Sequence, residues 1–351
     1  MEFNHFLSSF FPDPSYGGQR LYGDMIEQAR HADALGYASV SVPEHHLINI
    51  LLTPAPLQMA VKIAAETKRV KIVTSVAVLP LHDMRTYAGE LIMTDILTDG
   101  RLILGIGRGA FPFELGRLGV SIDESREKFD ESLNVLQALL TREEVSWEGK
   151  YYKFEPLTVM PRPERPIQMM LAAMVPDAIY HSVKRGLHIQ TTPLQGSKEH
   201  MLEQVSAFTR GRDELGAAGA HLTLSLLRVC FVAENEADKR RKAELAYGYY
   251  ERFDNVHVWG PGIVEHGVIK PLPPKLSVDE LMENTLIGTP EELIEKLSVY
   301  ADAGVDETIV NMNIGASQEE TLGSMQRFAD EVMPHFTKAG AANRDADLQS
   351  V

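Results

Sequence analysis

The chain has 351 residues, of which 44% are hydrophobic and 24% charged, values typical of a globular protein rather than a disordered one. Its net charge of −15 repels a nucleic-acid backbone or an anionic membrane unless a basic patch is present, and the sequence has none. No apolar stretch reaches the roughly 18 residues of a membrane span, and the N-terminus lacks a basic signal region, so we expect no membrane partner and a cytoplasmic location. Cys230 is the only cysteine, which excludes a disulfide within one chain.

Short apolar segments alternate with longer segments of helical period along the chain. This alternation is typical of repeated βα units that build a parallel sheet. It predicts an α/β fold, a single (β/α)8 TIM barrel over residues 1–337, followed by a flexible tail over residues 338–351. The predicted strands span residues 3–8, 38–42, 70–79, 101–107, 167–171, 187–191, 222–232 and 307–313.

Three of the connecting helices have readable ends. One spans residues 123–142 and carries acidic side chains in its first turn, where the helix dipole favours them. A second begins at Thr289-Pro290, an N-cap followed by proline, and ends at Gly304. The last spans residues 317–336.

Two segments interrupt the βα rhythm. Residues 144–165 contain Trp147-Glu148-Gly149-Lys150-Tyr151-Tyr152 followed by several prolines, which predicts a hairpin insertion. Residues 254–275 contain Trp259-Gly260-Pro261-Gly262 and are too long for an ordinary connection. Long loops of this kind are often active-site lids, so we expect a lid there.

Glu44-His45-His46 follows the second predicted strand, and active sites of β/α barrels form at the C-terminal ends of the strands. Alternation along an extended segment directs Glu44 and His46 to one side and His45 to the other. One imidazole can then face the barrel mouth as a proton donor or acceptor. The same residues are compatible with two structural histidines, or with a metal site completed by His5 and His188.

Gly105-Ile106-Gly107-Arg108-Gly109 ends the fourth predicted strand. Glycine lets the backbone approach a ligand closely, and the guanidinium of Arg108 suits a phosphate group. A dinucleotide fingerprint needs a further glycine that opens a helix, whereas Ala110-Phe111-Pro112-Phe113 follows here, which argues against a Rossmann site. The alternatives are a plain turn with a surface arginine and, for Arg126 among its acidic neighbours, a surface salt bridge.

Ser75-Val76-Ala77-Val78-Leu79-Pro80 is an almost wholly apolar strand end. Small and branched side chains there can give a flat ligand an apolar wall, although ordinary core packing explains such a run as well. We expect Phe6, Val76, Leu104 and Met170 to line an apolar pocket.

Together these residues resemble the bacterial luciferase-like flavin monooxygenases. The most specific stretch runs from Ile287-Gly288-Thr289-Pro290-Glu291-Glu292 to Glu331-Val332-Met333-Pro334 and is similar to the end of the luciferase α chain. The resemblance covers about residues 1–337. The other motifs, in the family's order and approximate spacing, are Glu44-His45-His46, Val78-Leu79-Pro80, Gly100-Arg101, Gly107-Arg108-Gly109, Ser125-Arg126 and Arg185-Gly186.

The resemblance implies roles for individual residues. Arg108 and Arg126 match the two arginines that bind the flavin phosphate, and His45 matches the catalytically important histidine. Ser75-Val76 matches the place of a non-prolyl cis peptide bond beneath the flavin ring. Residues 254–275 overlap the mobile loop that shields the oxygenated flavin from water.

Some positions depart from the luciferase pattern. Gly107 stands where luciferase has a reactive cysteine. Near the fifth helix, Val175 and Ala178 replace hydroxyl-bearing residues that contact the phosphate, so a phosphate contact there must use backbone N–H groups at a helix N-terminus. We expect Gly107, Val175 and Ala178 to lie at the cofactor site, but light emission does not follow.

The resemblance therefore implies a two-component monooxygenase. Reduced FMN, supplied by a separate flavin reductase through diffusion, reacts with O₂ to give a C4a-peroxyflavin that oxygenates an apolar organic substrate, an aldehyde, a ketone or a hydrocarbon. The family's dimerisation through helices outside the barrel implies a homodimer, and no metal is expected. The alternatives are an F420-dependent oxidoreductase of the same fold and a non-catalytic flavin-binding subunit; the presence of His45 argues against the latter.

Overall fold

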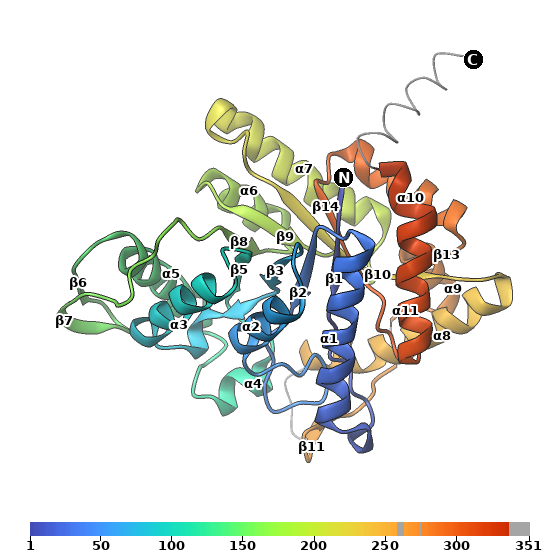
Figure 1. Cartoon of the computed structure of the whole chain (residues 1–351), viewed down its shortest axis with the longest axis horizontal. Helices are drawn as coiled ribbons and strands as arrows, with labels where there is room; N and C mark the ends of the chain where they lie inside the picture. The colour runs from blue at the N-terminus through green and yellow to red at the C-terminus, as the bar shows by residue number, and fades with distance from the viewer. Residues whose placement is uncertain (258–262, 274, 337–351) are drawn as a thin grey trace.

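Eight parallel strands form a closed barrel (Figure 1). The computed structural model describes residues 1–257, 263–273 and 275–336. The pairing of β9 with β10 and of β1 with β14 closes the ring, so the predicted (β/α)8 barrel is confirmed. In barrel order the strands are β1 (Glu2–Phe6), β2 (Ser39–Val42), β3 (Lys71–Thr74), β5 (Leu102–Gly107), β8 (Met169–Ala172), β9 (His188–Thr191), β10 (Leu224–Val232) and β14 (Glu307–Asn311).

Helices connect the strands and cover the outside of the barrel (Figure 1). Their apolar faces pack on outward side chains of the strands, such as Val40 and Ile72, in one continuous core. Within the described part of the chain, no helix is long and apolar enough to span a membrane. The helices are α1 (Gly18–Leu35), α2 (Pro56–Glu66), α3 (Met84–Leu97), α5 (Ser125–Thr141), α6 (Pro176–Lys184), α7 (Lys198–Leu215), α8 (Glu236–Phe253), α10 (Pro290–Ala303) and α11 (Gln318–Arg327).

The ends of α10 follow from local sequence alone. The Thr289 hydroxyl accepts the N–H of Glu292 while the Glu292 carboxylate accepts the N–H of Thr289, a capping box that satisfies two otherwise free donors. Pro290 occupies the first turn, and Gly304 ends the helix at φ 96°, a left-handed conformation that favours glycine. The predicted helix is confirmed.

The last predicted helix, residues 317–336, is wrong as one continuous α-helix. α11 ends at Arg327, and the chain continues as a π-helix over Phe328–Val332 and a 3₁₀ turn over Met333–Phe336. Pro334 has no backbone N–H and cannot continue an α-helical hydrogen-bond ladder.

The third predicted strand, residues 70–79, is wrong in its length. β3 ends at Thr74, the Ser75–Val76 peptide bond is cis, and β4 (Ala77–Val78) pairs with β5 instead of extending β3. A 3₁₀ turn over Leu79–Leu81 follows. The apolar pattern cannot reveal this break, because the residues before and after it are almost all buried.

Both predicted insertions contain structure of their own. β6 (Val145–Glu148) and β7 (Lys153–Leu157) form the predicted antiparallel hairpin. The segment 254–275 contains η4 (Asp254–His257) and a short hairpin of β11 (Val264–Glu265) and β12 (Val268–Ile269), and α9 (Val278–Asn284) and β13 (Leu286–Gly288) follow it. Residues 258–262, with the Trp259-Gly260-Pro261-Gly262 motif, residue 274 and the predicted tail over 338–351 lie outside the described residues.

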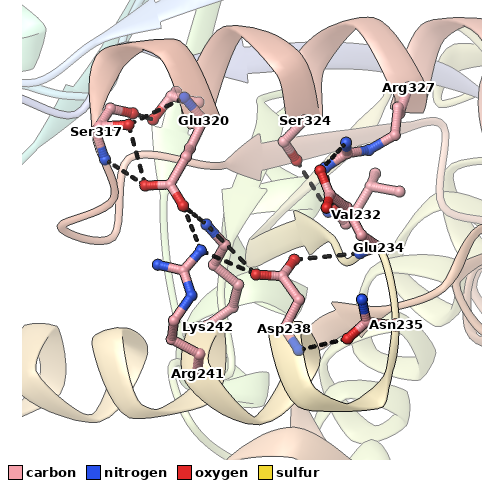
Figure 2. A network of polar contacts seen from close by, with 11 residues as sticks. Val232, Glu234, Asn235, Asp238, Arg241, Lys242, Ser317, Glu320, Ser324 and Arg327 are labelled. Atoms are coloured by element: carbon pink, nitrogen blue, oxygen red, sulfur yellow. Dashed lines mark hydrogen bonds and ion pairs between the residues drawn. The ribbon is translucent and has the colours of Figure 1, made fainter.

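A partly buried ion-pair cluster joins the N-terminal part of α8 to the first turn of α11. We call it the α8–α11 clamp, and its residues are Asp238, Arg241, Lys242, Ser317 and Glu320. Figure 2 shows Glu320 pointing from α11 toward Arg241 and Lys242 of α8. The ammonium of Lys242, a residue only 1% exposed, donates to Glu320 at 2.6 Å and lies 4.2 Å from the centre of the Phe231 ring. Glu320 also completes the capping box with Ser317, so one carboxylate caps the start of α11 and holds α8 in place.

Candidate functional site

The candidate site lies where the parallel strands end. Because all barrel strands run in one direction, the residues that follow β2, β3 and β5 meet at one end of the barrel. These residues include Glu44-His45-His46, Ser75-Val76 and Arg108. We call this end the barrel mouth.

The predicted alternation along Glu44-His45-His46 is observed. The ring of His46 turns back to Glu44, with 3.0 Å between Nε2 and the carboxylate, whereas His45 points to Glu114 at 3.1 Å from Nδ1. His45 also stacks on Phe111, with ring centres 4.2 Å apart and planes 10° apart. The two histidines therefore have different partners and different surroundings.

Glu44 is a support rather than a base. Its carboxylate, in a residue 1% exposed, accepts hydrogen bonds from the Val78 backbone N–H and the His82 ring, both at 2.8 Å, and from His46. Burial alone would raise the pKa of Glu44, but the hydrogen bonds from His46, His82 and the Val78 N–H and the charge interaction with His82 outweigh burial and lower this pKa to about 2. The same hydrogen bond to Glu44 raises the pKa of His46.

Glu114 is the residue that sequence reasoning missed. It lies in α4 (Pro112–Arg117), is 2% exposed, and accepts hydrogen bonds from His45 and from the backbone N–H of His46. Glu114 is 69 residues from His45 in the sequence, so no local pattern links the two. We name Glu44, His45, His46, His82 and Glu114 together the mouth network.

Arg108 and Arg126 lie near each other. Burial and the neighbouring charge of Arg126 lower the pKa of Arg108. Within the described ranges, neither guanidinium has a hydrogen bond or an ion pair with the protein. The surface salt bridge considered for Arg126 is not formed, because Glu124 and Glu127 pair with Lys150 at 3.5 and 2.8 Å. Two adjacent cations without partners form a place suited to a dianion.

The Ser75–Val76 bond lies against the glycines of β5. It is cis, as the resemblance implies, and the Ser75 hydroxyl donates to the buried Gln190 amide oxygen at 2.8 Å. A Cβ on Gly105 would lie 1.9 Å from the Thr74 carbonyl oxygen, and one on Gly107 would lie 2.5 Å from a Val76 methyl carbon. Gly107 therefore brings two backbone segments together, and a cysteine does not fit there without a shift.

Val175 and Ala178 lie at the start of α6, after β8, which is the barrel neighbour of β5. Val175 is the N-cap and is 63% exposed, and the N–H of Ala178 belongs to the first turn, where backbone donors have no partner within the helix. Asp177 also lies in this turn, and its negative charge opposes an anion. The backbone N–H groups at the start of α6 can thus contribute to an anion site, but the negative charge of Asp177 weakens their attraction for an anion.

The structure does not bring His5 and His188 to the mouth. His5 turns to Gln28 of α1, at 3.1 Å, and burial lowers its pKa to about 4. His188 lies at the start of β9, at the opposite end of the barrel, where its ring contacts Thr223. Among the residues that the structure describes, no group of three or more histidine, cysteine or acidic side chains could hold a metal ion.

The apolar surroundings differ in part from the prediction. Phe6 belongs to an apolar cluster at the mouth, and Met170 packs inside the barrel with Val73 and Ile103. Leu104 was predicted to line the pocket, but it packs in the core under the helices, because successive residues of β5 point to opposite faces.

An aromatic cluster that the sequence did not predict extends across the mouth. Phe111 contacts the rings of Phe253 and His257 edge-on, at 6.3 and 5.6 Å between ring centres. Phe253 in turn stacks on Tyr249, and Tyr249 meets Phe10 after β1. The end of α8 and η4 are thus connected to His45 through Phe111.

Comparison with known proteins identifies the relationship of this chain. A family model described as luciferase-like monooxygenase matches residues 1–307. The oxygenase component of a flavin-dependent trigonelline monooxygenase from Acinetobacter baylyi is 28% identical, with 95% of each chain covered. An F420-dependent glucose-6-phosphate dehydrogenase from Amycolatopsis mediterranei is 25% identical, with 90% of this chain and 95% of the relative covered. The crystal structure of the monooxygenase RslO1 from Streptomyces bottropensis has a TM-score of 0.80 and 27% identity, and the match covers 96% of this chain and all of that one (100%).

Proposed function

Because the chain belongs to the luciferase-like monooxygenase family, we propose that it is the oxygenase component of a two-component flavin-dependent monooxygenase. It takes reduced FMN and O₂ and oxygenates an apolar organic substrate such as an aldehyde, a ketone or a hydrocarbon. The observation that carries the proposal is the pair of adjacent, unpartnered guanidinium groups at the same barrel end as a histidine held by a carboxylate.

The residues of the mouth fit reduced FMN. Arg108 and Arg126 hold the phosphate, because planar, permanently charged guanidinium groups bind phosphate oxygens in pairs. The backbone N–H groups around Val175 and Ala178 contribute to the same contact. Ser75, Val76 and Gly107 provide a flat wall for the ring system. Once bound, the cofactor supplies the reducing electrons and the activation of O₂.

The chain's own residues then control protons and water. With Nδ1 directed to Glu114, Nε2 of His45 has no hydrogen-bond partner among the described residues and can hold or transfer a proton at the mouth. Phe111 covers one face of the imidazole, and His257 at the end of η4 lies beside Phe111. Exclusion of water by these groups protects the reactive cofactor from side reactions.

The substrate and the partners follow from the surfaces around the site. The aromatic side chains Phe10, Phe111, Tyr249 and Phe253 favour an apolar or aromatic substrate. A separate flavin reductase supplies reduced FMN by diffusion. Half-exposed apolar side chains on α3, Met93 and Leu97, support a homodimer that packs through outer helices, which light scattering after gel filtration checks.

A relative that depends on F420 provides the second candidate, an oxidoreductase that transfers hydride to or from F420. The two candidates differ in their need for oxygen. Turnover with reduced FMN that stops when O₂ is removed favours the monooxygenase, and turnover with F420 under nitrogen favours the alternative. Binding of flavin without any turnover indicates a non-catalytic subunit.

Anaerobic titration with reduced FMN tests the phosphate site directly. Arg108→Ala removes charge-assisted hydrogen bonds worth about 1.5–3 kcal/mol, so Kd should rise about 10- to 100-fold. His45→Ala should change Kd by less than about threefold, because its role concerns protons rather than the phosphate. Arg240→Ala, which removes a surface arginine of α8, is the matched control and should leave Kd unchanged.

Reduced riboflavin, which lacks the phosphate, completes the test. It should bind the wild type and Arg108→Ala equally well. Equal losses of reduced FMN affinity in Arg108→Ala and His45→Ala, or a loss of riboflavin affinity in Arg108→Ala, would contradict the assigned roles.

A further inference from the structure

Both carboxylate oxygens of Glu114 accept hydrogen bonds from the two histidines that follow β2. Oε2 accepts the hydrogen bond from Nδ1 of His45 at 3.1 Å, and Oε1 accepts the backbone N–H of His46. The Glu114 side chain is 3% exposed. An acid in the third position of a helix often caps its own helix, but Phe111 at the N-cap of α4 has no hydroxyl to complete such a box. Glu114 therefore reaches from α4 to a different strand.

The chemistry of these groups fixes the tautomer of His45. An ionised carboxylate can only accept hydrogen bonds, so Nδ1 of His45 must carry the proton. In the neutral ring Nε2 then keeps its lone pair, and within the described part of the chain it has no hydrogen-bond partner. The stacking on Phe111, at 4.2 Å, restrains rotation of the ring. Glu114 and Phe111 lie three residues apart, so one short segment after β5 holds His45 by both its edge and its face.

Glu44 holds the neighbouring histidine in the opposite way. It binds His46 and His82 through their Nε2 atoms, and it also accepts the N–H of Val78. Two buried carboxylates thus select different ring nitrogens of adjacent histidines. Because Glu114 binds Nδ1, His45 keeps Nε2 available at the mouth, whereas Nε2 of His46 and of His82 is taken by Glu44.

Other ionisable groups also surround His45. Glu44 and His46 lie on its own segment, and Glu114 lies on α4. His257 of η4 faces His45 closely enough for their charges to interact. The rings of His257 and Phe111 are nearly perpendicular with their centres 5.6 Å apart, so His257 lies beside the ring that stacks on His45. Glu114 is the acidic group in direct hydrogen-bond contact with the His45 ring.

We propose that Glu114 is a positioning residue that holds His45 with its proton on Nδ1 and its lone pair on Nε2, directed at the species bound in the barrel mouth. The importance of this arrangement for catalysis rests on the proposed monooxygenase function. The arrangement itself is a property of the flavin-free protein. Glu114 does not touch the substrate or the cofactor, and it acts through His45.

Nitrogen-15 NMR of the histidine rings tests the proposal without flavin or oxygen. The His45 resonances, assigned by their absence in His45→Gln, should show the Nδ1–H tautomer in the wild type. Glu114→Gln keeps one acceptor oxygen for two donors, and Glu114→Ala keeps none, so both should shift His45 toward the Nε2–H tautomer. Glu131→Gln is the matched control, since Glu131 of α5 also accepts several N–H groups, but from the turn of the β6–β7 hairpin.

Kinetics then separates positioning from general destabilisation. Glu114→Gln should lower kcat at least about tenfold, with KM for substrate and Kd for reduced FMN within about threefold, because a misdirected imidazole impairs proton transfer and not binding. Glu131→Gln should leave kcat unchanged. If Glu114→Ala does not fold, Glu114→Gln decides the question.

The outcomes distinguish this proposal from the proposed function. An unchanged His45 tautomer in a folded Glu114→Gln protein, or an Nε2–H tautomer in the wild type, would overturn the positioning role even if turnover with FMN is found. A shifted tautomer in a protein that neither binds reduced FMN nor consumes O₂ would retain the positioning role and remove the monooxygenase assignment.

Discussion

The mouth network and the α8–α11 clamp are both built around carboxylates that accept several hydrogen bonds, but their partners differ. In the clamp, Glu320 binds the side chains of Lys242 and Arg241 and the N-terminal turn of its own helix. In the mouth, Glu44 and Glu114 bind histidine rings, each of which has a second nitrogen for another contact. The clamp uses its hydrogen-bonding capacity internally, whereas the mouth leaves a ring nitrogen of His45 free.

The difference separates stability from chemistry within one barrel. A carboxylate whose oxygens bind two basic side chains and the first turn of its own helix fixes the position of two helices and has nothing left to offer a ligand. A carboxylate that binds a histidine leaves a second ring nitrogen for reaction, and the nearby Arg108 and Arg126 leave two charges for a phosphate. We therefore expect substitutions in the clamp to change folding, and substitutions in the mouth to change binding and turnover.

The largest expected effect is on stability, at the clamp. Glu320→Ala leaves the buried ammonium of Lys242 without its close partner and should lower the free energy of unfolding by about 3–5 kcal/mol. Urea unfolding measures this change. Glu319→Ala, at an exposed neighbour with no ion pair in the described part of the chain, is the control and should cost less than about 0.5 kcal/mol.

The double variant Glu320→Ala with Lys242→Met tests whether the stability lost in Glu320→Ala is due to the unpartnered ammonium. Methionine removes the uncompensated charge and keeps contact with Phe231, so the double variant should be more stable than Glu320→Ala alone. Both clamp variants should bind reduced FMN like the wild type. A large loss of FMN affinity in a folded clamp variant would mean that the two regions are not separate in function.

The second expected effect is smaller and depends on pH. The hydrogen bond to Glu44 raises the pKa of His46 in the folded protein. The contribution of this charged pair to the free energy of unfolding is therefore complete below pH 6.5, the ordinary pKa of histidine, and is lost as pH rises through the folded-state pKa. The stability difference between wild type and His46→Gln should be about 1 kcal/mol near pH 6 and should shrink toward pH 9. His82 and Glu114, which also face this site, remain in both proteins.

The clamp provides the contrast for this measurement. Arg241 is the clamp's permanent cation, and its hydrogen bond to Glu320 raises the pKa of its guanidinium further, so the stability difference between wild type and Arg241→Gln should not change between pH 6 and 9. A His46→Gln difference that is independent of pH, or that grows toward pH 9, would show that the mouth and the clamp respond to protonation in the same way.

Locally encoded features could be predicted from the sequence, and those that depend on distant contacts could not. The two residues of the α10 capping box, Thr289 and Glu292, lie three residues apart, and the strands have a clear apolar pattern, so both were found. The break at Ser75–Val76 is hidden in the strand pattern because its neighbours are buried on both sides; only the family resemblance indicated it.

The same reasoning applies to the site. The strand ends supplied His45 and Arg108, since active sites of barrels form there. The pairing of His45 with Glu114 joins residues 69 positions apart, and the contact of Phe111 with Phe253 joins two segments farther apart still. The sequence alone does not show which residues far apart along the chain lie close together in space. Phe111 was noted only as a residue that disrupts a Rossmann motif, and the carboxylate three residues later gave no local signal.

The smallest expected change in the free energy of unfolding is at an exposed ion pair. It tests whether an ion pair stabilises the fold when its side chains are not buried. Lys153 and Glu148 form an ion pair across the β6–β7 hairpin, but their side chains are 72% and 77% exposed. Water screens these charges, and ordering two long side chains costs entropy that offsets the attraction. Lys153→Ala should therefore change the free energy of unfolding by less than about 0.5 kcal/mol, and added salt should not alter this difference measurably. A loss approaching that of Glu320→Ala would show that ion pairing rather than burial sets the strength of the clamp.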